Sequence, residues 1–320
     1  TVTRIAEKKC RNAIRVARNL NPEAIIAVMG CMSQINDKEI EKIEGVDLII
    51  GNDDKKKLVD LIEERQTKSP TENLVFDISR LKSYYPSYSS SDRTRSFLKI
   101  QDGCDYFCTY CAIPYSRGRS RNDDIASVVA QAKILAGQGK KEVVLTGVNI
   151  GDFGKSTGES FLDLIKALDK VEGIERYRIS SIEPNLITEE VIDFCVESKA
   201  FLPHFHIPLQ AGTNKILRLM KRKYERELFA QRVNYINKVM PHAFIAADVI
   251  VGFPGETEED FEEAKSFIDG LPLAALHVFT YSERPGTPAA SMQGCVPMSE
   301  RHRRSEELQK ISTRKKEEFY

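Results

Sequence analysis

Three cysteines lie close together in the segment GCDYFCTYC, at Cys104, Cys108 and Cys111. A structural zinc site is closed by four ligands, commonly two close cysteine pairs, and this segment offers one such pair. A disulfide would use two of the cysteines and strand the third. An iron–sulfur cluster is normally held by four cysteines, so three leave one iron of a four-iron cluster open. The spacing therefore predicts a 4Fe-4S cluster with one coordination position open to another molecule.

The elements that must position these cysteines are strands and helices in regular alternation. Strand-like runs occur at 96–100, 142–147, 176–181, 204–209, 244–252 and 273–279. Helical patterns lie between them, at 123–138, 160–170, 188–199, 214–240 with a break, and 257–270. Such alternation is typical of parallel βα units, and six units suit a partial, TIM-like (βα)6 barrel of the α/β class. The cysteines directly follow the first strand, on the face where such barrels build active sites.

The rest of the chain flanks this barrel. The predicted segments are an α/β domain over 1–80, a linker over 81–95, the barrel core over 96–290 and a C-terminal helix within 291–320. In the first segment the pattern predicts a helix over 4–19, strands over 24–30 and 47–51, and a further helix from about 54. The linker is predicted because 81–95 is rich in Ser and Tyr and has no helical period.

Composition limits the possible partners. Of 320 residues 41% are hydrophobic, and 47 Lys and Arg balance 47 Asp and Glu, so overall charge does not indicate nucleic-acid binding. No apolar run approaches the ~20 residues of a membrane span, and the start has no apolar signal region. The seven cysteines are an odd number unevenly spread, which favours free thiols and metal ligands over disulfides. We therefore expect a cytoplasmic protein without membrane or DNA partners.

The segment CDYFCTYC resembles the signature of the radical S-adenosylmethionine (SAM) enzymes. The resemblance implies that the open iron chelates the amino and carboxylate groups of SAM. The reduced cluster then cleaves SAM to a 5′-deoxyadenosyl radical, which takes hydrogen from an unreactive carbon. Tyr110 matches the aromatic position of the signature, and the resemblance places it against the adenine of SAM.

Further motifs resemble the methylthiotransferases of this superfamily. They are VLTGVNIG, RISSIEP, HIPLQAGTN, LMKRKY, DVIVGFPGETEEDF and LHVFTYSERPGTPAA. Within that family, SSIEP and MKRKY are most similar to the branch that acts on N6-threonylcarbamoyladenosine in tRNA, beside the anticodon. The branch for isopentenyl-adenosine is the alternative. The resemblance implies the anticodon loop of tRNA and an electron-donor protein as partners.

The segment GCMSQ resembles the end of that family's N-terminal domain, where three cysteines hold an auxiliary 4Fe-4S cluster. Cys31 matches one of these three, and the other two are expected before Thr1. Cys10 matches none, and we interpret it as a thiol on a helix face. The family's C-terminal RNA-binding β-barrel, the TRAM domain, is expected after Tyr320.

Residues at the carboxyl ends of the predicted strands are candidates for binding SAM. They are Gly147, Asn149, Glu183 and Gln210, and Asp248, which lies within the fifth strand, is a further candidate. The alternative for each is a loop cap or a supporting hydrogen bond. Gly252 and Gly255 in VGFPGET either allow close approach to SAM or form a plain turn before the next helix. His204 and His206 alternate on a strand like a metal-binding pair, but we expect buried, hydrogen-bonded positions in the barrel.

Two basic clusters are candidates for RNA contact, because they follow the cysteine segment and HIPLQAGTN on the rim where substrate enters. They are Arg117, Arg119 and Arg121, and Lys221, Arg222 and Lys223. A third cluster, at 301–304, lies on the late helix and is less favoured for this role.

These features lead to one hypothesis. The chain is predicted to be a tRNA methylthiotransferase in which one SAM methylates a sulfur on the auxiliary cluster. A second SAM, at Cys104, Cys108 and Cys111, generates the radical that opens the C2–H bond of the modified adenine. The rival from another class is a non-catalytic RNA-binding module holding zinc or an iron–sulfur cluster.

Overall fold

Six parallel strands form the centre of the molecule in a computed structural model that describes residues 4–64, 70–89 and 95–320. The strands are β5 (Arg95–Lys99), β8 (Glu142–Thr146), β9 (Arg176–Ile179), β10 (His204–His206), β11 (Phe244–Val251) and β12 (Ala275–Thr280). They pair in chain order, β5-β8-β9 and β10-β11-β12, and the bridges Tyr177–Phe201 and Ser181–His206 join the two halves. The arrangement confirms the predicted partial (βα)6 barrel.

Each predicted strand run overlaps an observed strand; five of the observed strands are shorter than predicted, and β5 has the predicted length but begins one residue earlier. The largest difference is at 204–209, where β10 ends at His206. Pro208 has no N–H to donate to a neighbouring strand. Its carbonyl instead accepts a hydrogen bond from the Tyr224 hydroxyl at 2.6 Å. The regular strand is therefore interrupted at Pro208, and the chain pairs with β11 again at Gln210, which bridges to Val249.

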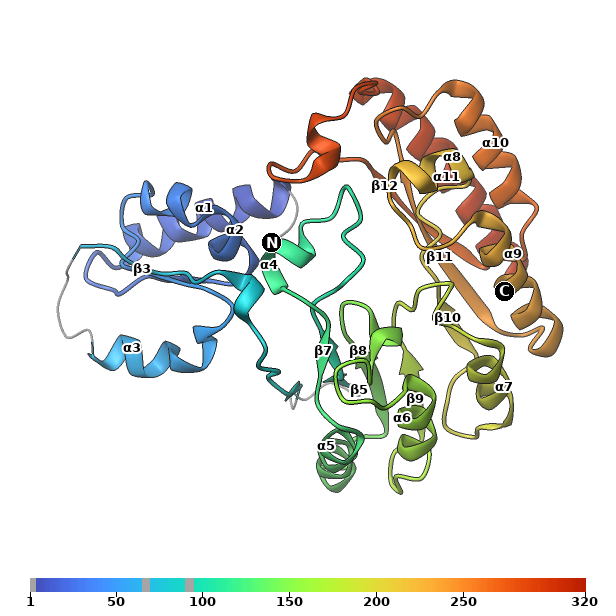
Figure 1. The fold of residues 1–320 in the computed structure, drawn as a ribbon, viewed down its shortest axis with the longest axis horizontal. Coiled ribbons are helices and arrows are strands. Elements are labelled where there is room, and N and C mark those ends of the chain that lie inside the picture. The colour runs from blue at the N-terminus through green and yellow to red at the C-terminus, as the bar shows by residue number, and fades with distance from the viewer. Residues whose placement is uncertain (1–3, 65–69, 90–94) are drawn as a thin grey trace.

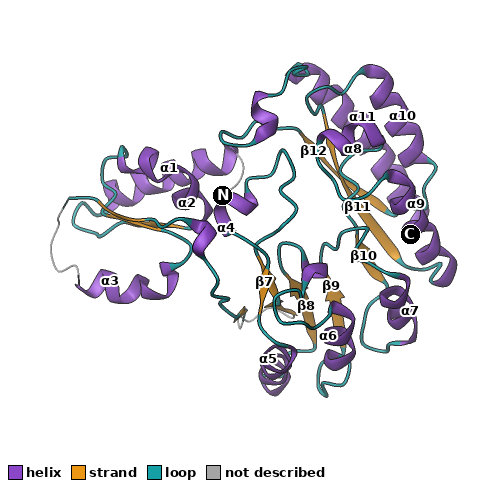
Figure 2. Cartoon of the chain, viewed as in Figure 1, coloured by secondary structure: helices purple, strands orange, loops and turns teal. Residues whose placement is uncertain are grey.

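Helices cover the outer face of the barrel strands (Figure 2). They are α5 (Ile125–Gly137), α6 (Phe161–Leu168), α7 (Glu189–Glu197), α8 (Asn214–Leu219), α9 (Arg226–Val239), α10 (Glu258–Asp269) and α11 (Met298–Phe319). Five of them begin at a side-chain cap that accepts a backbone N–H: Asp124, Ser160, Thr188, Thr213 and Thr257. These caps satisfy N–H groups that have no partner inside the helix.

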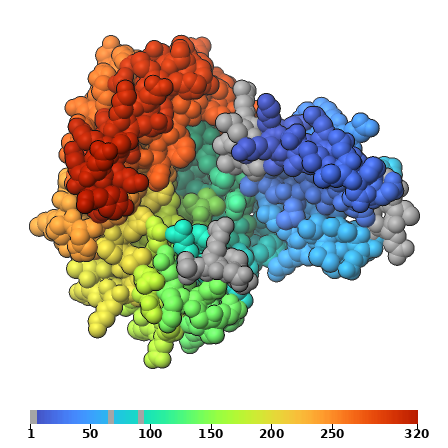
Figure 3. Space-filling model, turned by 180° about the vertical axis from the view of Figure 1, so that it is seen from behind, coloured from blue at the N-terminus to red at the C-terminus, as the bar shows by residue number. Residues whose placement is uncertain are grey.

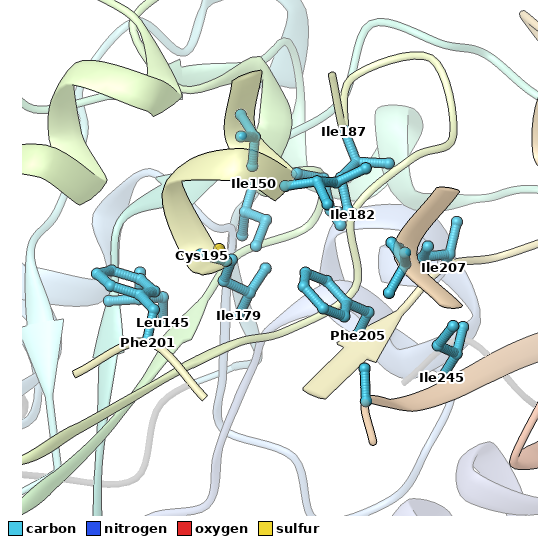
Figure 4. Close-up of a cluster of buried hydrophobic side chains, with 14 of the residues drawn as sticks. Leu145, Ile150, Ile179, Ile182, Ile187, Cys195, Phe201, Phe205, Ile207 and Ile245 are labelled. Carbon is cyan, nitrogen blue, oxygen red and sulfur yellow. The ribbon is translucent and has the colours of Figure 1, made fainter. Parts of the chain in front are cut away.

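The two faces of each barrel strand differ in character. On β11, Ile245, Ala247 and Val249 belong to the hydrophobic core that packs under the helices. Figure 4 shows part of this core, including Phe205 and Ile245. The intervening side chains face the inside of the open barrel and include polar residues such as Asp248. Because side chains alternate along a strand, one face builds the core and the other is available to a site.

The N-terminal part of the chain forms a lobe beside the barrel (Figure 1, blue). It contains α1 (Arg4–Leu20), β1 (Ala27–Met29), α2 (Cys31–Glu41), β2 (Leu48–Ile50), η1 (Asp54–Lys57), α3 (Leu58–Glu64) and β3 (Glu72–Leu74). The parallel sheet order is β1-β2-β3, and β3 is a strand that the sequence pattern did not indicate. In the space-filling view this lobe projects sideways, and atoms of the first barrel units are recessed beside it (Figure 3).

Part of the predicted linker is structured. Residues Ser87–Tyr88 form β4, which pairs antiparallel with β5 at the edge of the barrel sheet. The Tyr84 hydroxyl donates to the Lys99 carbonyl at 2.5 Å, and the Tyr85 hydroxyl donates to the Asp53 carbonyl at 3.1 Å. This segment therefore contacts both the barrel and the N-terminal lobe. The predicted domain boundaries stay predictions.

Short elements complete the described chain. They are β6 (Gln101–Asp102), β7 (Arg121–Asn122), α4 (Ile113–Arg117), η2 (Ile78–Arg80), η3 (Ile150–Asp152) and η4 (Pro288–Ser291). β6 and β7 pair antiparallel on either side of the cysteine segment. Among the residues that the structure describes, no helix is both long and apolar enough to span a membrane.

The ion pair of Arg304 and Glu256 predicts how strongly α11 is held to the barrel. The two side chains are 5% and 7% exposed and their charged atoms lie 2.6 Å apart. Arg304→Ala leaves the Glu256 carboxylate buried without its partner, so we expect a loss of about 3 kcal/mol in the free energy of unfolding. Urea denaturation measures it. The matched control, Arg303→Ala, removes exposed ion pairs and should cost less than about 1 kcal/mol. Equal losses would contradict the prediction.

Candidate active site

The cysteine segment is a loop whose backbone is held at both ends. Gly103 has φ 73°, and a Cβ at this position would lie 1.9 Å from the Arg119 carbonyl oxygen, so only glycine fits. The Cys104 N–H donates to the Gly118 carbonyl at 3.0 Å. Farther along, the Thr109 N–H donates to the carbonyl of Met220 at 3.1 Å. The loop is thus fixed between the β6–β7 pair and the turn that follows α8.

Cys104 and Cys111 lie in surroundings that oppose ionisation of their thiols. Burial raises the pKa of Cys104 to about 12 and that of Cys111 to about 11. Because thiolates rather than thiols bind metals, ligation here would release protons. In the described part of the chain, one group of three His, Cys, Asp or Glu residues has its donor atoms all within 4.8 Å of one another, and it consists of His206, Asp248 and His277. The cysteine sulfurs are therefore too far apart to share one ion, whereas a four-iron cluster gives each cysteine its own iron.

Arg222 lies against the cysteine loop. Its side chain is 2% exposed, and Nη1 donates to Cys108 Sγ at 3.1 Å and to the Tyr110 hydroxyl at 3.3 Å. Nη2 forms an ion pair with the Glu183 carboxylate, which follows β9. Nε donates to the Tyr224 hydroxyl at 3.2 Å. This guanidinium links two predicted SAM residues, Tyr110 and Glu183, to the cysteines and brings positive charge to the place where thiolates would form.

The other predicted SAM residues lie at the same end of the sheet. Asn149 is 2% exposed, and its side-chain amide atoms have no hydrogen-bond partner among the described residues. Gly147 packs on Gln101, whose Oε1 would lie 2.9 Å from an added Cβ. Gln210 has φ 65°, and its carbonyl accepts from the Ile250 N–H at 2.8 Å. Asp248 Oδ1 lies 2.7 Å from His206 Nε2. Asn149 is the clearest of these candidates, because its buried amide makes no hydrogen bond within 3.5 Å among the described residues, although it lies near the Asp152 carboxyl.

The VGFPGET segment is held by α11 and also reaches the cysteine loop. An added Cβ at Gly252 would lie 2.3 Å from Arg301 Cγ, so this glycine allows close approach of a protein side chain. The Gly252 N–H donates to Glu256 Oε1 at 3.0 Å, as expected of a turn before α10. The rings of Phe253 and Tyr110 meet edge to face with centroids 6.5 Å apart. The segment is thus a structural turn that forms a wall beside Tyr110.

His204 and His206 do not face each other as a metal pair. His204 Nε2 contacts the Arg178 guanidinium, and burial together with that charge lowers its pKa to about 4. His206 pairs with Asp248 and lies against the His277 ring, at 5.1 Å between centroids. Both histidines are therefore hydrogen-bonded as expected, but they are half-buried and not buried. The donor atoms of His206, Asp248 and His277 are the ones close enough to hold a single cation.

Cys31 lies at the start of α2, facing the segment that follows Cys111. It lines the same small cavity as Ala112. Although burial opposes ionisation, the Arg117 guanidinium and a hydrogen bond from Ser116 hold the pKa of Cys31 below its usual value. The N-terminal thiol and the cysteine loop thus approach each other across α4. Cys10 packs on the apolar core of the N-terminal lobe, as expected of a helix-face thiol.

Exposure divides the six basic residues that were predicted to contact RNA. Arg121 is buried and donates to the carbonyls of Ser83, Arg117 and Arg119 and to Asp102. Arg222 is buried at the cysteine loop, and Arg117 is half-buried at Cys31. Neither Arg121 nor Arg222 presents its charge to solvent, which differs from the expectation of two surface clusters. Arg119, which is 65% exposed, Lys221 and Lys223 remain on the surface.

Sequence reasoning missed the role of Arg222 beside Cys108. A run of three basic residues usually forms a solvated face, and nothing in LMKRKY marks the middle one as buried. The available signal was positional. Glu183 follows the third barrel strand, Arg222 follows the short helix after HIPLQAGTN, and the two residues carry opposite charges. Lys99 and Asp102 also carry opposite charges, and both lie at the end of the first predicted strand.

Comparisons with known proteins agree with this geometry. The radical SAM superfamily matches residues 98–268, and "Uncharacterized protein family UPF0004" matches residues 1–51. The "Threonylcarbamoyladenosine tRNA methylthiotransferase MtaB" of Bacillus subtilis is 42% identical, over 100% of this chain and 72% of that protein. A "tRNA-2-methylthio-N(6)-dimethylallyladenosine synthase" of Alkaliphilus oremlandii is 36% identical, over 89% of this chain and 61% of that protein. In fold, the radical SAM methyltransferase TsrM from Kitasatospora setae matches with a TM-score of 0.69 at 18% identity, over 88% of this chain and 60% of that chain.

The close contact at Gly103 makes a prediction for metal binding. Gly103→Ala places a Cβ against the Arg119 carbonyl at a left-handed φ, so we expect the cysteine loop to shift and the iron bound per chain to fall to less than about half. Iron content after anaerobic reconstitution measures it. Gly139→Ala is the matched control, because φ is 76° there and no atom lies within 4 Å of the added Cβ. Equal iron contents in the two variants would refute the prediction.

Proposed function

The chain belongs to the tRNA methylthiotransferase family of radical SAM enzymes, and from this we propose that it inserts a methylthio group at C2 of N6-threonylcarbamoyladenosine beside the tRNA anticodon. Membership confirms the resemblance seen in the cysteine segment and the later motifs. Relatives named for dimethylallyladenosine are less similar, at 36% against 42% identity. The isopentenyl-adenosine substrate is therefore the second candidate.

One structural observation supports the proposal most directly. Cys31 of the N-terminal lobe and the cysteine loop of the barrel approach each other across a single short helix, α4. A transfer that joins a carbon radical to a sulfur group needs the two sources of chemistry close to one substrate atom. A metal-holding RNA module without catalysis has no such need, and the three sulfurs do not all lie within 4.8 Å of one another, as binding one zinc ion would require.

We propose that Cys104, Cys108 and Cys111 hold a 4Fe-4S cluster and that Cys31 is one ligand of an auxiliary cluster. When bound, the clusters and SAM supply a carbon-centred radical and a methylated sulfur. The chain's own residues bind and orient the clusters and SAM. Arg222 places positive charge beside Cys108, and the Glu183 carboxylate holds Arg222 in place.

The remaining cofactor residues are proposed to position SAM. The buried amide of Asn149 can donate and accept a hydrogen bond, as binding a polar group requires. Gly147, Gln210 and Asp248 line the same end of the sheet, and Tyr110 offers its ring beside Phe253. The closed core behind these residues keeps water from that side of the site.

We propose that tRNA contacts the exposed rim residues Arg119, Lys221 and Lys223. Arg119 stacks over the Phe107 ring at 4.5 Å and pairs with Asp105 at 3.6 Å, and its exposed guanidinium has further N–H donors that can bind phosphate. The two lysines flank Arg222 on the turn between α8 and α9, so they surround the mouth of the cofactor site. An electron-donor protein and a cytoplasmic location remain predictions.

The activity is tested by anaerobic reconstitution of the intact enzyme and mass spectrometry of tRNA nucleosides. We expect the methylthio product of threonylcarbamoyladenosine with wild type and its loss, by at least about 100-fold, in Cys104→Ala, because a missing ligand disrupts the cluster. Cys295→Ala changes an exposed thiol and should retain activity. Product only from isopentenyl-adenosine tRNA would support the second candidate, and full activity of Cys104→Ala would support the binding module.

The rim contact is tested by the salt dependence of tRNA binding. Replacing Arg119, Lys221 and Lys223 by Gln should weaken binding and reduce the slope of log affinity against log salt by about 2, since each phosphate contact contributes about 0.7 on single strands. The matched control replaces three exposed lysines of the outer helices α5 and α6 and the turn after α6, namely Lys133, Lys166 and Lys170. An unchanged slope in the rim variant would place the tRNA elsewhere.

A further inference from the structure

A pocket of about 480 Å³ lies on the inner face of the barrel, at the carboxyl ends of β5 and β8. Its walls include Lys99 and Phe97 from β5, Thr146 from β8, and Tyr88 from the edge strand β4. Arg117, at the end of α4, closes the side towards the N-terminal lobe. The pocket therefore lies between the first two barrel strands and the end of α4, and its Arg117 also contacts Cys31.

The polar wall of the pocket is positively charged. Lys99, Arg117 and Arg121 all surround one carboxylate, that of Asp102, at 3.6, 3.1 and 3.3 Å. Three cations share a single anion there, which leaves an excess of positive charge. Arg121 is turned away into backbone carbonyls, so the excess faces the pocket through Lys99 and Arg117. Burial also lowers the pKa of Lys99. An anion bound beside Lys99 would raise that pKa again, because the anion and the protonated lysine stabilise each other.

Arg117 has donor capacity that the protein does not use. Its Nη1 donates to Asp102 Oδ1 at 3.1 Å, but its buried Nε has no hydrogen-bond partner among the described residues. A guanidinium presents its N–H donors in a fork that matches a carboxylate. Asp102 and Cys31 therefore satisfy only part of this arginine.

The other wall suits a flat, unsaturated ring. Tyr88 is 37% exposed although it is a large aromatic residue, and Phe97 is half-buried beside it. Aromatic faces stack on nucleobases. Gly147 leaves the floor without a side chain at this point. The pocket thus combines an aromatic wall for a base with a cationic wall for an anion.

We propose that this pocket binds the modified adenine, with the aromatic wall against the base and Lys99 and Arg117 on the threonine carboxylate of the threonylcarbamoyl group. The inference rests on the proposed function, since it takes this nucleoside as substrate. An isopentenyl group has no charge, and it would leave the two cations facing an apolar chain. Lys99 and Arg117 therefore select the carboxylate-bearing substrate. Arg117 also contacts Cys31, so a base held by it lies next to the proposed auxiliary site.

The test uses the intact reconstituted enzyme and three anticodon stem-loop RNAs that differ at one adenine. The first carries threonylcarbamoyl, the second carries the same group with its carboxylate converted to a neutral amide, and the third is unmodified. Equilibrium binding is measured by fluorescence anisotropy and methylthio product by mass spectrometry. We expect wild type to bind the carboxylate form about 10- to 100-fold more tightly than the amide form, the range of one or two charge-assisted hydrogen bonds.

Variants assign that preference to the pocket. Lys99→Gln should reduce the carboxylate preference to less than about threefold, and Lys99→Arg should retain most of it because the positive charge is kept. Arg117→Gln, measured by binding alone, should also lose the preference. Lys215→Gln is the matched control, a half-exposed lysine that pairs with Asp260 on the outer helices. Thermal unfolding verifies that each variant is folded.

The outcomes separate the inference from the proposed function. If wild type forms the methylthio product but binds both modified RNAs equally, or if Lys99→Gln keeps the preference, the pocket is assigned wrongly while the function holds. If Lys99→Gln weakens the binding of the unmodified RNA by the same factor as the binding of the carboxylate form, the lysine binds a phosphate, and this result also overturns the inference. If no methylthio product forms but the carboxylate preference depends on Lys99, the function fails and the pocket stands.

Discussion

The buried ion pair of Arg222 and Glu183 is the interaction on which the rest of the site depends. Arg222 is 2% exposed, and it reaches Cys108, Tyr110 and Tyr224 as well as Glu183. A buried arginine without its carboxylate would be strongly unfavourable, so the two charges hold each other inside the protein. They also join three separate parts of the chain: the cysteine loop, the end of β9 and the turn after α8. The geometry of the cofactor site is therefore set by long-range charge pairing.

The barrel makes this possible because its strands have two different faces. The outer face is closed by helices over a continuous apolar core, and rigid strands hold the inner face in place. Lys99, Thr146, His206 and Asp248 all belong to the inner face. The barrel has six strands, so its interior is open on one side, and polar groups there can meet a substrate without crossing the core. Stability and chemistry are thus assigned to opposite sides of the same strands.

Much of this could be predicted from the sequence, because local patterns carry it. Alternating strand and helix patterns predicted the barrel, and the cysteine spacing predicted an open cluster site, which family membership supports. What could not be predicted depends on tertiary contacts. β3 has only three residues and no apolar alternation, and β4 pairs only because β5 offers a free edge. Arg121 and Arg222 lie in sequence runs that normally stay in solvent, and their burial follows from distant carboxylates at Asp102 and Glu183.

The contact between the N-terminal lobe and the barrel passes through α4. Asn52 of the lobe donates its Nδ2 to the Ser116 carbonyl, and the next residue, Arg117, lies against Cys31 while pairing with Asp102. The helix begins at Ile113, two residues after Cys111. Little more than one helical turn therefore separates the contacts of the lobe from the cysteine loop. The spacing between Cys31 and the loop depends on the non-covalent contacts of Cys31 with Ser116 and Arg117 and on the covalent continuity of α4 with Cys111.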